Sequence, residues 1–269
     1  MTAFANHFAF EFKTGLRNPT LLLMNYLFPL AFYAMMGVVM TQINPGFKES
    51  IIPAIVIFAV MVSTLLGLPG PLVESREAGI FRSFKINGIQ ATSILAIPTL
   101  TTIFHALIVS VIIALTGGPF FGGQTPVSWV SFALITLLAA FTFGAIGSLI
   151  GVIASGSRST VLWSQLIFLP SMLLGGLMMP LEILPKSILP FSSLLPSTHA
   201  MQAFNGLAYA QETVLNPQVS VAVLASSGLL AFGLAIYLFN WDSRNNSRRG
   251  HPLLALLVLL PYLIGIFLA

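Results

Sequence analysis

Residues 74–89 read ESREAGIFRSFKINGI and separate two long apolar runs at roughly 51–73 and 92–116. The chain has only 11 Lys and Arg and 7 Asp and Glu, and five of these side chains lie in this stretch: Glu74, Arg76, Glu77, Arg82 and Lys85. A polar stretch between two segments long enough to cross a bilayer must lie in water or against another protein. We therefore expect membrane-spanning helices on both sides of a charged connection.

The charged connection is expected to form a short amphipathic helix. On a helical wheel, Ile80, Phe81 and Phe84 share one apolar stripe that could dock on a partner. A solvated loop that only fixes the topology is the alternative, and the connection by itself does not decide between the two.

The charges of this helix follow the helix dipole. Glu74 and Glu77 are expected in its first turn and Lys85 in its last turn. The two acidic residues lie three positions apart and repel each other, so they need partners outside the pair.

The composition indicates an all-α polytopic membrane protein. Hydrophobic residues make up 57% of the chain, charged residues 7%, and the mean hydropathy is +0.96. A soluble domain has about 25% charged residues. The 269 residues leave room for six or seven spans, but not for a soluble catalytic domain. The net charge of +4 is small and dispersed, which does not indicate nucleic-acid binding, and without cysteine there is no disulfide or thiol chemistry.

The apolar runs predict a transmembrane domain at 1–240, followed by a basic linker and a C-terminal hydrophobic segment at 241–269. Six spans are expected, at about 20–41, 51–73, 92–116, 128–154, 161–179 and 219–240. The Pro-rich but apolar connection at 180–217 is too long for a plain loop, so we expect two short re-entrant helices there.

The N-terminal segment at 1–19 is expected to be an interfacial amphipathic helix. Phe4, Phe8 and Phe12 recur every four residues, and the segment ends at Arg17-Asn18-Pro19.

The basic residues predict the orientation. With a cytoplasmic N-terminus, nine Lys and Arg lie inside and two outside. The inside set is Lys13, Arg17, Arg76, Arg82, Lys85, Arg158, Arg244, Arg248 and Arg249, and the outside set is Lys48 and Lys186. This predicts a multi-pass protein of the cell membrane with a cytoplasmic N-terminus.

The sequence contains no Gly-Lys pair, and therefore no Walker A loop, and no HExxH metal motif. No catalytic, cofactor or metal residue is predicted. His105 is the one ionisable side chain within a predicted span, and we interpret it, like Asn25 and Gln165, as hydrogen-bonded to a neighbouring helix.

Small residues line one part of the fourth predicted span: Gly144, Gly147, Ser148 and Gly151. They permit close approach of helices. Packing within the subunit is the simpler interpretation, and a ligand or dimer surface is the alternative.

Several short motifs occur in a characteristic order: Arg17-Asn18-Pro19, Pro29, Glu74-Ser75-Arg76-Glu77-Ala78-Gly79, Pro180-Leu181-Glu182-Ile183-Leu184-Pro185 and Leu195-Pro196. In this arrangement the chain resembles the membrane subunits of ABC-2 type transporters, the permeases of drug, lipid and polysaccharide exporters. The resemblance covers about residues 4–240.

This resemblance implies that the 74–89 loop is a coupling helix that contacts an ATP-hydrolysing subunit. Glu74, Arg76, Glu77, Ile80, Phe81 and Phe84 would then form the coupling site. It also implies two copies of a cytoplasmic ABC ATPase that binds ATP and Mg, and a second permease copy or homologue in the bilayer.

The expected function is therefore export of a hydrophobic or amphipathic substrate by a permease without its own nucleotide site. The alternatives are an importer or lipid-handling permease of similar architecture and a non-transporting scaffold or sensor subunit. A secondary carrier is disfavoured because the spans lack charged residues. The apolar stretch at 252–269, interrupted by Pro261, departs from the six-span pattern of the family and leaves the side of the C-terminus open.

Overall fold

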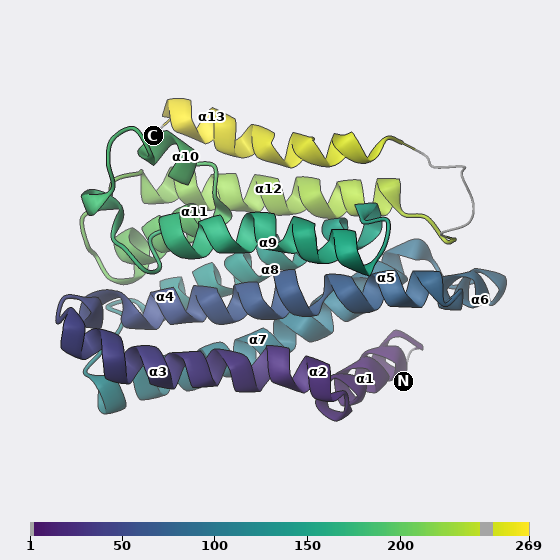
Figure 1. The fold of residues 1–269 in the computed structure, drawn as a ribbon, viewed down its shortest axis with the longest axis horizontal. Helices are drawn as coiled ribbons and strands as arrows, with labels where there is room; N and C mark the ends of the chain where they lie inside the picture. The colour runs from purple at the N-terminus through teal and green to yellow at the C-terminus, as the bar shows by residue number, and fades with distance from the viewer. Residues whose placement is uncertain (1–2, 243–249, 269) are drawn as a thin grey trace.

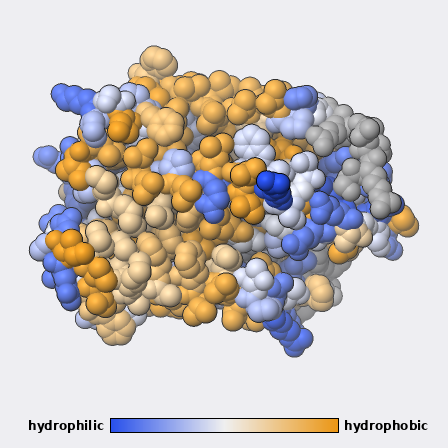
Figure 2. Space-filling view, in the orientation of Figure 1, coloured by the Kyte–Doolittle hydropathy of each residue, from blue (hydrophilic) through white to orange (hydrophobic). Residues whose placement is uncertain are grey.

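The computed structural model describes residues 3–242 and 250–268, and this part of the chain is helical without any strand (Figure 1). The side chains of residues 3–7 and 268 lie outside the description, and so do Arg244, Arg248 and Arg249 of the predicted inside charges. Within the described part, five helices are long and apolar enough to cross a membrane: Pro19–Ile43, Phe47–Glu77, Ala91–Phe121, Trp129–Ile153 and Pro217–Leu238. Figure 2 shows hydrophobic side chains across the middle of one face and hydrophilic ones at both ends, as a bilayer requires.

The helix Phe47–Glu77 is the centre of the bundle. It consists of α4 (Phe47–Met61), the π-helical η2 (Val62–Gly67) and α5 (Pro69–Glu77), and 94% of its most apolar window is buried. A helix that is apolar all round can only be buried in protein or lipid. This helix extends four residues beyond the predicted 51–73 at each end, which brings the first acidic residues of the charged connection into its last turn.

Of the other five long helices in the described chain, four pack against this centre: α3 (Phe28–Ile43, continuous with α2, Pro19–Leu22, and the π-helical η1, Leu23–Leu27), α7 (Ala91–Phe121), α8 (Trp129–Ile153) and α9 (Ser157–Leu174). The fifth, α12 (Pro217–Leu238), packs mainly against α8. These five helices overlap the first, third, fourth, fifth and sixth predicted spans.

The predicted fifth span at 161–179 differs most from the structure. Helix α9 ends at Leu174, and the chain turns at Gly176, whose φ of 85° is readily adopted only by glycine. Polar residues at the start of α9 lower its hydropathy, and it is not among the five helices that meet the criteria for a span. A count of six spans is therefore not established by length and composition.

Short helices occupy the connection between α9 and α12: η3 (Leu181–Ile183), α10 (Leu189–Ser192), α11 (Pro196–Ala203) and the π-helical η4 (Phe204–Ala208). Every residue of α11 is buried, and α11 packs against α12, α8, α9 and α4. Its backbone groups are thus shielded by protein.

The C-terminal hydrophobic segment runs alongside α12 (Figure 1). It consists of the 3₁₀ helix η5 (Pro252–Leu259) and α13 (Leu260–Leu268). Because 3₁₀ residues rise by about 2 Å and α residues by about 1.5 Å, the segment reaches about 30 Å, the thickness of the hydrocarbon core. Tyr262 is 1% exposed, and its ring centroid lies 5.5 Å from that of His199.

The N-terminal helix α1 (Ala3–Arg17) docks on α7. The ring of Phe12 stacks on His105 at 4.5 Å, and Phe8 contacts Phe104 edge-on at 6.3 Å. Phe8 and Phe12 therefore contact protein, and the interfacial position of this helix stays a prediction. Phe10, on another face, is 66% exposed, and the side chain of Phe4 lies outside the description.

Candidate functional site

The charged connection forms two helices joined by a sharp bend, which we call the elbow (residues 69–86). Helix α5 ends at Glu77, and α6 (Ile80–Ile86) begins after Gly79, whose φ is 76°. The expectation of one helix with Glu74 and Glu77 in its first turn is wrong. The apolar helix of the second span continues through these residues, so they lie in its last turn, where the helix dipole disfavours acids. Lys85 does lie in the last turn of α6.

Arg76 is buried within the subunit, with 6% exposure. Its guanidinium donates to the carbonyl oxygens of Gly151 at 3.2 Å and Val152 at 2.8 Å, and also to that of Ala154. The last carbonyls of a helix have no partner inside it, and a cation there also complements the dipole. Arg76 therefore ties α5 to the C-terminal end of α8.

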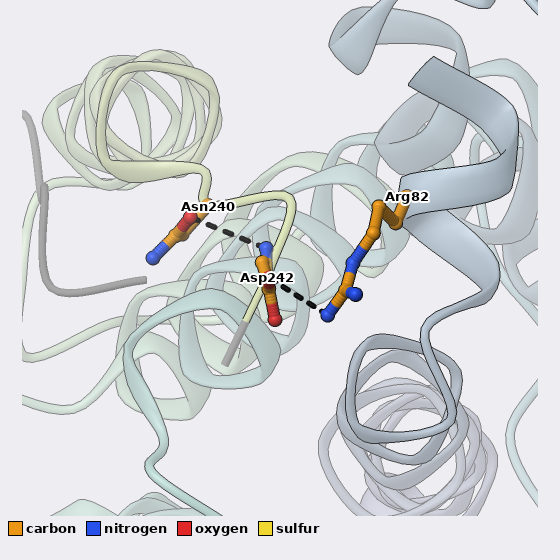
Figure 3. A network of polar contacts seen from close by, with 3 residues as sticks. All are labelled: Arg82, Asn240 and Asp242. Carbon is orange, nitrogen blue, oxygen red and sulfur yellow. Dashed lines mark hydrogen bonds and ion pairs between the residues drawn. The ribbon is translucent and has the colours of Figure 1, made fainter. Parts of the chain in front are cut away.

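Helix α6 is fixed to the segment that follows α12. The Phe81 ring is 5% exposed and lies 5.5 Å from the ring of Phe239. Arg82 forms an ion pair of 2.7 Å with Asp242, whose backbone N–H donates to the Asn240 side chain (Figure 3).

Lys85 completes this attachment, with its Nζ 5.9 Å from the centroid of the Trp241 ring. We call these contacts between α6 and residues 239–242 the latch. The residues on the α12 side of the latch were not predicted from the sequence. Their one signal is Asp242, a single acid at the start of a basic stretch.

The predicted stripe of α6 divides between two surroundings. Of its three residues, Phe81 is buried and Phe84 half-buried, whereas Ile80 is 44% exposed. Ile86, which is not part of the predicted stripe, is 81% exposed. Helix α6 projects beyond the ends of the other helices (Figure 1). The most exposed apolar side chains of α6 are therefore the two isoleucines.

Glu74 and Glu77 are also exposed. A Cβ placed at Gly156, in the turn between α8 and α9, would lie 3.1 Å from Glu77 Oε1. This turn and the elbow therefore form one continuous surface.

The small residues of α8 lie against helices of the same subunit. A Cβ at Gly147 would overlap the backbone oxygen of Thr64, and one at Gly151 would lie 2.9 Å from Leu72. Gly144 faces Thr99, whose hydroxyl lies 2.6 Å from that of Ser148. All four predicted packing residues thus allow α8 to approach the central helix or α7 closely.

His105 contacts neighbouring helices as a lone polar residue is expected to do. Its Nδ1 lies 2.6 Å from the Tyr26 hydroxyl. Across residues 3–242 and 250–268, no three His, Asp or Glu side chains gather as they would around a metal ion.

Comparison with known proteins agrees with this architecture. The family model described as ABC-2 type transporter matches residues 3–209. A protein of Bacillus subtilis (strain 168), named "Putative transport permease YvfS", is 26% identical over 205 residues, which cover 70% of this chain and 78% of that protein. No solved structure matches the chain.

Proposed function

Because the chain belongs to the ABC-2 type transporter family, we propose that it exports a hydrophobic or amphipathic substrate as the membrane subunit of an ATP-driven complex. ATP and Mg bind to a separate cytoplasmic ABC ATPase, present in two copies. A second permease copy or a homologue completes the translocation path.

One observation supports this proposal above the others: the most buried helix of the bundle ends at Glu77 and is separated by only two residues from α6, which exposes Ile80 and Ile86. A force applied to α6 acts on the central helix through Gly79 and Glu77. It reaches α8 through Arg76 and the end of α12 through the latch. Three long helices therefore move with one short exposed helix, as alternating access driven from one side requires.

The distribution of charge supports a cytoplasmic elbow and N-terminus. In Figure 1, α1, the elbow and the turn between α8 and α9 lie at the same end of the molecule. Lys13, Arg17, Arg82 and Lys85 belong to α1 and the elbow, and Arg158 is in the first turn of α9, directly after the turn. Under the positive-inside rule this end faces the cytoplasm.

Ile86→Asp tests the coupling site. We expect this variant to insert normally and to lose co-purification with the ATPase and ATP-dependent flux in inverted vesicles. A buried apolar contact replaced by a carboxylate at an interface hot spot costs about 2 kcal/mol or more. Unchanged assembly and flux would contradict the proposal.

Ile43→Asp is the matched control, because Ile43 is also exposed, at 72%, but ends α3. It should leave ATPase association unchanged. Phe81→Ala is a second comparison: since Phe81 packs on Phe239, it should destabilise the permease even when the ATPase is absent.

A further inference from the structure

A cavity of about 230 Å³ lies between α1, the first two spans, α6 and α7. This volume is the space open to the centre of a water-sized sphere, of which one water molecule needs about 10–15 Å³. The cavity can therefore hold a small organic molecule. It is lined by exposed residues such as Phe10 and Ile80 as well as by buried ones, and therefore opens to the surface between α1 and the elbow.

Two buried polar side chains face this cavity. Asn25 and His105 are each 2% exposed, and Asn25 Oδ1 and His105 Nε2 have no hydrogen-bond partner among the described residues. A Cβ at Gly67 would lie 3.6 Å from Asn25 Oδ1, and one at Gly15 would lie 2.7 Å from His105 Nε2. Asn25 and His105 are themselves lining residues of the cavity, and their unpaired atoms lie beside Gly67 and Gly15. Buried polar groups without a partner are rare and require an explanation.

The backbone beside the cavity contains two π-helical turns, which are uncommon. The π-helical turns η1 and η2 contact each other here, and they contribute Asn25 and Gly67 to the wall. Such turns frequently occur at functional sites.

The polar end of the cavity mainly offers hydrogen-bond acceptors. Asn25 Oδ1 can only accept. The Thr101 hydroxyl already donates to the carbonyls of Ile97 and Pro98, which leaves its oxygen to accept. The carboxylate of Glu11, which also has an interaction within the protein, lies in the wall as well. A ligand that matches this end must donate hydrogen bonds.

The rest of the lining is mainly apolar and includes Leu72, Phe81 and Phe84. Two of these residues belong to α6. We propose that the cavity binds an uncharged amphiphile with a hydroxylated head at Asn25 and His105 and one apolar chain against α5 and α6. This site goes beyond the proposed export function, because it lies within one subunit and needs no ATPase.

Photo-crosslinking of the permease alone, in nanodiscs, tests this site. The probe is a monooleoylglycerol that carries a diazirine in its chain. We expect crosslinks concentrated in α5, α6 and α7, and apparent affinity about tenfold lower in Asn25→Leu, since one hydrogen bond to the head is lost. Gln165→Leu is the matched control, because Gln165 Oε1 in α9 is also buried and unpartnered among the described residues but does not line the cavity.

Asn25→Leu should fold, since it removes an unpaired buried acceptor and keeps the volume. Leu21→Trp, which fills the cavity from α2, is a second variant and should also abolish crosslinking. Crosslinks spread evenly over the lipid-exposed helices, or binding retained in both variants, would overturn the proposal. Competition by water-soluble monobutyrin would support the site with access from water, and competition by unlabelled monooleoylglycerol alone would support it with access from the bilayer.

Discussion

At the scale of single residues, Arg76 is counted among the charges that set the membrane orientation, but its contacts give it a structural role. Its guanidinium is buried on the last carbonyls of α8. We expect Arg76→Gln to lower the free energy of unfolding by about 1.5–3 kcal/mol, the range for hydrogen bonds to charged groups. Thermal unfolding in detergent measures this loss.

Arg82→Gln is the control for Arg76. Arg82 is 52% exposed, and an exposed ion pair contributes about 0–1 kcal/mol. If both variants lowered stability equally, Arg76 would not have the structural role that its contacts indicate.

At the scale of helices, the elbow depends on Gly79. Its φ of 76° is left-handed, and a Cβ there would meet nothing within 4 Å. Gly79→Ala should therefore destabilise the protein through backbone conformation alone, by about 1–2 kcal/mol. It should also weaken transport-linked ATP hydrolysis, because the angle between α5 and α6 changes.

Gly70→Ala is the matched control within the same elbow. Gly70 also has open space around it, but it lies inside α5 in a helical conformation. Alanine there should stabilise the protein by about 0.5–1 kcal/mol. Chemical denaturation of both variants should show shifts of opposite sign, and shifts of equal sign would contradict this account of the bend.

The helices were largely predictable from the sequence, but most of the contacts between them were not. The apolar runs predicted the long helices because the bilayer requires continuous apolar segments. The helical wheel grouped Ile80 with Phe81 but could not identify the neighbour of each side chain. The contacts of Arg76 with Gly151 and of Arg82 with Asp242 join distant parts of the chain, and no local pattern encodes them.

At the scale of the whole molecule, the predicted orientation can be tested by labelling single residues from one side of the membrane. Ser83 and Ser187 are both exposed, and the chain has no cysteine, so single introduced cysteines report the side of the membrane rather than burial. A membrane-impermeant maleimide should label Ser187→Cys in intact cells and Ser83→Cys only after permeabilisation. The reverse pattern would contradict the positive-inside orientation.

The same experiment decides the path of the C-terminal segment. The C-terminal end of α13 lies at the end of the molecule that contains α10, opposite the elbow (Figure 1). Phe267 is 89% exposed, so Phe267→Cys should label from outside together with Ser187→Cys. Labelling of Phe267→Cys only after permeabilisation, with Ser187→Cys still labelled from outside, would mean that residues 252–268 return to the cytoplasmic side. The contact between Tyr262 and His199 would then be broken, because His199 belongs to α11, which lies toward the end opposite the elbow (Figure 1).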